Sequence, residues 1–314
     1  MAMIRTQSEY VDIVVPGART KRVKGEEVKR RTKPVEDMWE VAELFEKGEY
    51  PLLVVDTLTI MLNKALRQIA NEDLSASDTK ETRRSGFDIG GKRITNPTLQ
   101  DYGMLISVMS EWFEELWQIC QANESFVIFT GHEGIVSQED ENEVTISAIG
   151  SIDAPGRKIG PRLPANMQAT LRITRQRVKG KRASKRIVMA EDDGLWKAKD
   201  RLGIWAPDGT EIDVPRKDGE DPDAHKERIV RSYVDLWKRW FTAADKRNAI
   251  GTVALYGPPG AGKTLMAAGA AVAMKELTGE KTLFFDVDGE GTLVLPEFMV
   301  QEPKPRRVKA KASK

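Results

Sequence analysis

The sequence predicts an α/β fold in which a mostly parallel sheet is flanked by helices. Short apolar runs of strand length occur at 10–15, 51–55, 125–130, 252–256 and 282–287. Uninterrupted runs of this kind are typical of parallel strands buried on both faces. Helical patterns lie between the runs, and this alternation indicates an α/β protein. An apolar content of 40% in 314 residues is sufficient for one large core.

Three segments have the periodicity of amphipathic helices, namely 35–47, 98–121 and 224–244. In the second, the apolar stripe from Leu99 to Ile119 is interpreted as core. Two further strands are expected at 168–178 and 185–199. The first of these carries so much charge that we expect it near a sheet edge.

A glycine-rich segment follows the apolar run 252–256 and precedes an alanine-rich helix. It reads Gly257-Pro258-Pro259-Gly260-Ala261-Gly262-Lys263-Thr264 and continues with Leu265, a complete G-x-x-x-x-G-K-T pattern. Its glycines let backbone N–H groups surround phosphate oxygens, and the helix directs its positive end at them. In this pattern the lysine contacts the β- and γ-phosphates and the threonine hydroxyl binds Mg²⁺. The segment predicts a site for ATP and Mg²⁺.

A phosphate loop of this type needs a carboxylate from a neighbouring strand to hold the magnesium ion. The apolar run ending at Val55 is followed directly by Asp56. Asp56 could instead cap the next helix. Because the chain has a phosphate loop, the magnesium role is preferred.

Hydrolysis also needs a group that orients or deprotonates the attacking water. Thr57, rather than Glu, follows Asp56, so this acid must come from elsewhere. The strand 282–287 leads into an acidic turn in which Asp288 and Glu290 are both candidates. The alternative is that they are ordinary turn residues.

The order of these motifs is unusual because the magnesium strand precedes the phosphate loop. If the C-terminus is joined to the N-terminus, Asp56 follows Lys263 by 107 residues, an ordinary spacing. In that order the chain resembles the phage-encoded single-domain RecA-like ATPases, a recombinase group that acts with single-strand annealing proteins. The resemblance covers about 270 residues and rests on GPPGAGKT, FFDVDGEG, LLVVDTLT, FVIFTGHE and the run Lys197–Arg201. It implies a RecA-type P-loop NTPase core, circularly permuted so that the phosphate loop lies near the C-terminus.

The resemblance implies roles for three more side chains. His132 occupies the position of the family's polar γ-phosphate sensor, although a lone histidine is more often structural. Lys199 and Arg201 fall on one face of the expected strand. The resemblance implies that they reach the γ-phosphate of a neighbouring subunit as finger residues, whereas the alternative is a solvated basic edge. The family usually has Glu at the position of Asp288, so the identity of the base stays open.

The resemblance also divides the chain into four segments. These are 1–205, with the magnesium, sensor and finger strands; 206–247, a linker and connecting helix; 248–300, with the phosphate loop and acid strand; and 301–314, a basic disordered tail.

Two long polar segments, at about 75–97 and 134–160, follow the magnesium and sensor strands. The resembled family has its DNA-facing loops at these places. Cations attract phosphates and an aromatic ring stacks on bases; the candidates are Arg83, Arg84, Phe87, Lys92, Arg93, Arg157, Lys158 and Arg162. The alternative is a pair of ordinary loops with scattered charge.

Composition limits partners and location. The 49 Lys and Arg nearly balance the 48 Asp and Glu, so net charge gives no preference for nucleic acid. Cys120 alone cannot form an internal disulfide. No apolar run approaches the roughly 20 residues of a membrane span. We therefore expect a cytoplasmic protein, in the host cytoplasm if phage-encoded, with no membrane partner.

The leading hypothesis is a Mg²⁺-requiring, DNA-dependent ATPase that forms a ring or filament on single-stranded DNA and assists recombination or replication. Its candidate protein partner is a single-strand annealing or binding protein. Two alternatives stay open. One is a helicase or packaging-type DNA motor, and the other is an ATP-dependent switch or scaffold with little turnover.

Overall fold

The computed structural model describes most of the chain. The described residues are 4–16, 20–23, 26–29, 33–48, 50–72, 86–89, 92–139, 145–156, 158–177, 184–206, 208–247, 251–287, 289 and 291–301.

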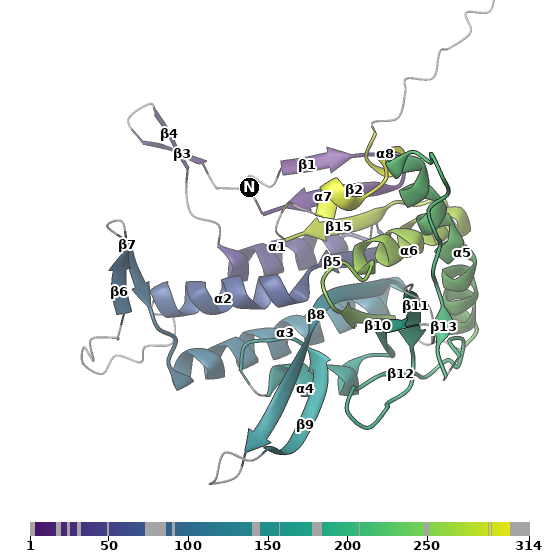
Figure 1. Cartoon of the computed structure of the whole chain (residues 1–314). Coiled ribbons are helices and arrows are strands. Elements are labelled where there is room, and N and C mark those ends of the chain that lie inside the picture. The colour runs from purple at the N-terminus through teal and green to yellow at the C-terminus, as the bar shows by residue number, and fades with distance from the viewer. Residues whose placement is uncertain are drawn as a thin grey trace, which may run out of the picture.

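A sheet of eleven strands forms the centre of this part of the chain, with helices on both faces (Figure 1). Its middle is parallel and has the order β2-β15-β5-β8-β14-β10. These strands are β2 (Val11–Val15), β5 (Leu52–Asp56), β8 (Phe126–Glu139), β10 (Ala169–Arg177), β14 (Gly251–Gly257) and β15 (Thr282–Asp286). The predicted α/β class and mostly parallel sheet are confirmed, and each of the five apolar runs forms one of these strands.

Antiparallel strands complete the sheet. They are β1 (Ile4–Gln7) beside β2, β9 (Thr145–Ile152) beside the far half of β8, and β11 (Ser184–Met189), β12 (Lys199–Asp200) and β13 (Thr210–Glu211) beyond β10. Two separate antiparallel pairs are β3 (Thr20–Val23) with β4 (Glu26–Lys29), and β6 (Gly86–Ile89) with β7 (Lys92–Thr95).

The strands nearest the C-terminus lie inside the sheet. β14 lies between β8 and β10, and β15 lies between β2 and β5. All residues of both strands are buried. The N-terminal and C-terminal parts of the sequence therefore share one sheet.

Each face of the sheet has its own helix layer. One layer consists of α1 (Pro34–Glu46), α2 (Leu58–Glu72) and α3 (Leu99–Asn123), and the other of α5 (Pro222–Lys246) and α6 (Lys263–Thr278). A fully buried tryptophan lies in each layer. Trp112 Nε1 donates to Met38 O at 2.9 Å, and Trp237 Nε1 donates to Met266 O at 2.9 Å. These bonds satisfy the buried indole N–H groups while the rings fill the core.

The helix boundaries have local causes. Thr98 and Asp101 form a capping box at the start of α3, and Glu124 ends that helix in the left-handed region with φ 51°. The Asp221 carboxylate accepts the N–H groups of Asp223 and Ala224 at the start of α5. All three predicted helices are confirmed; α1 is shifted by one residue, and α3 and α5 each end two residues later than predicted.

The two ends of the described chain meet at one side of the sheet. β2 pairs with β15, and α7 (Gly291–Val294) and α8 (Glu297–Val300) follow β15. The rings of Tyr10 and Phe298 contact edge to face with centroids 5.2 Å apart. The predicted tail beyond 301 lies outside the described residues.

The charged end of β10 lies near an edge of the sheet, as expected. β14 pairs only with Ala169–Arg172, so Arg175 and Arg177 have register partners on β11 alone, and only the two-residue β13 lies beyond β11.

Two expectations need correction. The expected strand 185–199 is interrupted after Met189, where the Asp193 carboxylate accepts the N–H groups of Leu195 and Trp196 in a turn. The polar segments 75–97 and 134–160 contain the pairs β6–β7 and β8–β9, because their β-branched residues support strands.

Candidate nucleotide site at the carboxyl ends of the strands

The phosphate loop joins β14 to α6 at the carboxyl end of the sheet. At Gly257 an added Cβ would lie 2.1 Å from Ile173 O, so a side chain cannot fit there. Gly260 and Gly262 have left-handed φ values of 70° and 96°, which favour glycine. Gly262 caps α6, and the first N–H groups of a helix have no intrahelical partner. The segment therefore has the backbone form that cradles an anion.

Lys263 curls back over this loop. Its Nζ donates to Gly257 O and Pro258 O, each at 3.0 Å, and the residue is 6% exposed. Burial lowers the pKa of Lys263, while Asp56 and Glu133 act in the opposite direction. A bound polyanion would compensate the cost of burying this cation.

Asp56 connects the phosphate loop to the N-terminal half of the chain. Its Oδ2 accepts a hydrogen bond from Thr264 Oγ1 at 2.9 Å, across 208 residues of sequence, and its Oδ1 accepts one from Thr130 Oγ1. Asp56 is 3% exposed. Mg²⁺ prefers hard oxygen ligands, typically a carboxylate or two with phosphate oxygens and water. The carboxylate and threonine hydroxyl therefore fit a magnesium ion bound together with a nucleotide.

Thr57 supplies a cap to the helix after Asp56. Its Oγ1 accepts the Ile60 N–H at 3.3 Å, and its carbonyl accepts the Met61 N–H. The start of α2 thus has a capping side chain next to Asp56, which weakens the capping interpretation of Asp56.

The sensor candidate lies beside the phosphate loop. In the parallel pairing of β8 with β14, His132 is the register partner of Gly257. The His132 N–H donates to Thr59 Oγ1 at 3.0 Å, and Thr59 Oγ1 donates to Asp153 O. These bonds hold the sensor segment at the loop.

A carboxylate that sequence reasoning missed follows His132. Glu133 accepts a hydrogen bond from Arg172 Nε at 3.1 Å, and the Arg172 guanidinium lies 3.7 Å from the centre of the Trp196 ring. The signal available in the sequence was the acid directly after the sensor position. This cluster joins β8, β10 and the segment that leads to β12.

The acidic turn after β15 starts at the same edge of the sheet. Asp286 is the register partner of Asp56, is fully buried, and accepts the Gly289 N–H at 3.1 Å. The Val287 N–H donates to Asp56 O at 2.8 Å. Asp288 and Glu290 lie outside the described residues, so their role as water-activating acids stays a prediction.

The finger candidates lie at the opposite end of the sheet. Lys199 Nζ and Arg201 Nη2 lie 3.4 and 3.2 Å from the carbonyl oxygen of Ala165. The Arg201 N–H donates to Gln168 O, and the Gln168 N–H donates to Thr252 O at the start of β14. Thr252 and Gly257 are five residue steps apart along the strand, a distance of roughly 16 Å. The structure therefore does not bring Lys199 and Arg201 to the phosphate loop of their own chain.

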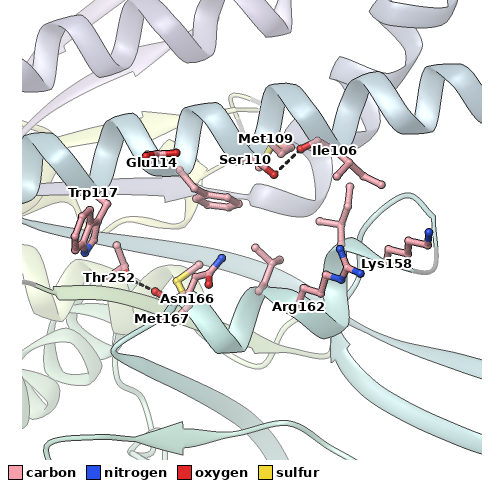
Figure 2. A pocket seen from close by; sticks show the side chains of 13 residues that line it. Ile106, Met109, Ser110, Glu114, Trp117, Lys158, Arg162, Asn166, Met167 and Thr252 are labelled. Atoms are coloured by element: carbon pink, nitrogen blue, oxygen red, sulfur yellow. Dashed lines mark hydrogen bonds between the residues drawn. The ribbon is translucent and has the colours of Figure 1, made fainter.

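Two of the DNA candidates line a cavity of about 530 Å³ between α3 and α4 (Ile159–Asn166). Figure 2 shows Lys158 and Arg162 at one end of it and the half-exposed Trp117 at the other. Thr252, near the start of β14, also lines the cavity. The cavity therefore lies at the amino end of β14, away from the phosphate loop. Arg162 belongs to α4 rather than to the expected loop.

The other DNA candidates are less fully described. Phe87 lies on β6, and Lys92 and Arg93 lie on β7, with Phe87 paired to Ile94 in the register. Arg83, Arg84 and Arg157 lie outside the described residues.

Two arginines that the sequence analysis did not single out lie beside the phosphate loop. Arg175 Nη2 donates to Gly260 O at 3.1 Å. A Cβ added at Gly262 would lie 3.9 Å from Arg186 Nη1. Arg175 belongs to β10 and Arg186 to β11, so no linear motif includes them.

Comparison with known proteins adds no relative. No family model, no curated protein and no solved structure matches the chain.

No helix in the described part of the chain is long and apolar enough to cross a membrane.

Proposed function

We propose that this protein is a Mg²⁺-dependent ATPase with a circularly permuted RecA-type core. The hydrogen bond between Thr264 Oγ1 and Asp56 Oδ2 carries the proposal. A complete phosphate loop could arise by chance in a sequence. A buried carboxylate placed on the threonine of that loop, from a strand elsewhere in the sequence, supplies the second half of a magnesium site.

Different residues have different roles in the proposed reaction. The loop amides and Lys263 bind the phosphates and stabilise the charge that develops on the transferred group. Asp56 and Thr264 would hold Mg²⁺, which would neutralise part of the negative charge of the phosphates. His132 is the proposed γ-phosphate sensor, and Asp288 or Glu290 orients the attacking water.

The sheet order supports the permuted RecA-type core. The sensor strand β8 lies between the phosphate-loop strand β14 and the magnesium strand β5, and the acid strand β15 lies next to β5. Ligands of open parallel sheets bind outside the carboxyl ends of the strands. The contact of Phe298 with Tyr10 supports the permutation, because a short connection there would restore the order of the resembled family.

Single-stranded DNA and further copies of the chain are the proposed partners. The antiparallel pair β8–β9 continues directly from the sensor strand and projects from the body of the molecule (Figure 1). A ligand on this pair would therefore be connected to the nucleotide site through His132. Lys199 and Arg201 lie away from their own phosphate loop, as finger residues acting on a neighbour would.

The direct test is ATP turnover by wild type and Lys263→Ala, with and without single-stranded DNA. We expect Mg²⁺-dependent turnover that DNA stimulates, and a loss of several orders of magnitude in the variant. Circular dichroism of the variant should match that of wild type, because Lys263 bonds only neighbouring loop carbonyls among the contacts described for its side chain.

The result also separates the alternatives. Normal turnover by Lys263→Ala would remove the ATPase proposal. ATP binding without turnover would favour the switch or scaffold, and strand separation coupled to hydrolysis would favour the helicase or motor.

A further inference from the structure

The face of β10 and β11 that packs against α5 and α6 ends in two arginines. Ile173 on β10 and Val188 on β11 are buried in the core on that face. Two residues further along β10 and two residues earlier on β11 are Arg175 and Arg186, which are direct register partners. Side chains alternate along a strand, and direct partners point to the same face. Both arginines therefore continue the face on which the phosphate loop lies.

Both guanidinium groups reach the glycines of that loop. Arg175 Nη2 bonds Gly260 O at 3.1 Å, and a Cβ on Gly262 would be 3.9 Å from Arg186 Nη1. Burial raises the pKa of Tyr233 on α5 to about 12, and the nearby charge of Arg186 acts in the opposite direction. Two cations from adjacent strands are thus held at the left-handed turns that shape the loop.

Like charges directly opposite each other on antiparallel strands destabilise the pair. The neighbouring strand β13 carries a carboxylate, Glu211, but it bonds Lys185 at 2.6 Å on the other face of β11 from Arg186. Arginine presents a planar fork that binds phosphate oxygens in bidentate fashion. A chain of phosphates in the loop would offset the repulsion between the two arginines.

We propose that Arg175 and Arg186 form a clamp that binds the phosphate chain of the nucleotide from the side of the loop opposite Asp56. This inference rests on the proposed ATP site and adds two binding residues to it. In this proposal both arginines contact the phosphates and not the base or ribose.

The test measures binding of Mg²⁺–ATP and of inorganic triphosphate, which has no base or ribose, to Arg175→Gln and Arg186→Gln by calorimetry. We expect each variant to weaken both ligands by about tenfold or more, because charge-assisted hydrogen bonds are lost. Lys185→Gln is the matched control, since it removes the same charge from the other face of β11 and should leave both affinities unchanged. Thermal unfolding without ligand checks that each variant folds.

Three results would overturn the clamp. Weaker ATP binding with unchanged triphosphate binding would move the contact to the base or ribose. An effect of Arg175→Gln without an effect of Arg186→Gln would make Arg175 a support for the Gly260 turn. Unchanged affinity in both variants would leave no clamp. If wild type binds neither ligand, the proposed ATP site itself fails; if Lys263→Ala weakens binding while both arginine variants bind normally, only the clamp fails.

Discussion

The two ends of β14 differ in how complete they are within one chain. At the carboxyl end, the buried Asp56 accepts hydrogen bonds from Thr130 and Thr264, and its charge acts on the buried Lys263. At the amino end, Lys199 and Arg201 share a backbone carbonyl of α4 beside a cavity. The proposed Mg²⁺–nucleotide site therefore draws its residues from one chain. The amino end has two cations without an anion among their described contacts, so its role depends on a group from outside the chain.

The lysines at the two ends show the same difference. Burial lowers the pKa of Lys263, but the carboxylates of Asp56 and Glu133 favour its charged form. Burial lowers the pKa of Lys199 to about 8, and the neighbouring Arg201 acts in the same direction. An anion from a partner would favour the charged form of Lys199, as the carboxylate of Asp56 favours the charged form of Lys263.

The largest effect is expected at the amino end. Arg201→Ala should reduce DNA-stimulated turnover by about a thousandfold or more, the size of a lost arginine finger. Mixing it with inactive Lys263→Ala should restore part of the activity, because one subunit contributes an intact phosphate loop and the other an intact Arg201. Turnover across a series of mixing ratios is the measurement. Inactivity at every ratio would show that Arg201 does not act on a neighbouring subunit.

A smaller effect is expected at the polar segment that contains β6 and β7. Replacing Arg83, Arg84, Lys92 and Arg93 together should weaken binding to all single-stranded sequences and flatten the salt dependence, because fewer counterions are released. Phe87→Ala should cost about 1 to 3 kcal/mol with an unchanged salt slope, since stacking releases no counterions. Fluorescence titrations at several salt concentrations give both quantities. If neither variant changes DNA binding or DNA-stimulated turnover, the scaffold hypothesis becomes preferable.

The smallest effect concerns the pH dependence of turnover. Lys199 is charged below its pKa of about 8 and loses that charge as the pH rises through this value. If its charge stabilises a neighbour's phosphate, kcat/KM should fall above about pH 8 in wild type. In the Lys199→Arg variant the side chain stays charged above pH 8, so kcat/KM should stay constant to higher pH than in wild type. Identical pH profiles for the two proteins would argue against a catalytic charge at this position.

The sequence predicted the strands and the phosphate loop because their signals are local. An apolar run or a spaced set of glycines determines its own conformation, as at Gly260 and Gly262. Asp56 could be proposed because a second acid was needed, but its contact with Thr264 depends on the strand order. Arg175 and Arg186 were missed because only tertiary contacts bring them near the loop, whereas Glu133 had a local signal in its position directly after His132. The interruption after Met189 was missed because the turn depends on Asp193 side-chain bonds that compete with strand pairing.

The central claim is that Asp56 and the phosphate loop form one magnesium–nucleotide site. A Mg²⁺ titration of ATP turnover in wild type and Asp56→Asn tests it most directly, with ATP affinity measured separately. The variant should need far more Mg²⁺ and turn over slowly even at saturation, while its affinity for nucleotide without metal changes little, because Asp56 acts through the ion. Coincident Mg²⁺ titrations of the two proteins would contradict the claim and leave Asp56 with a structural role.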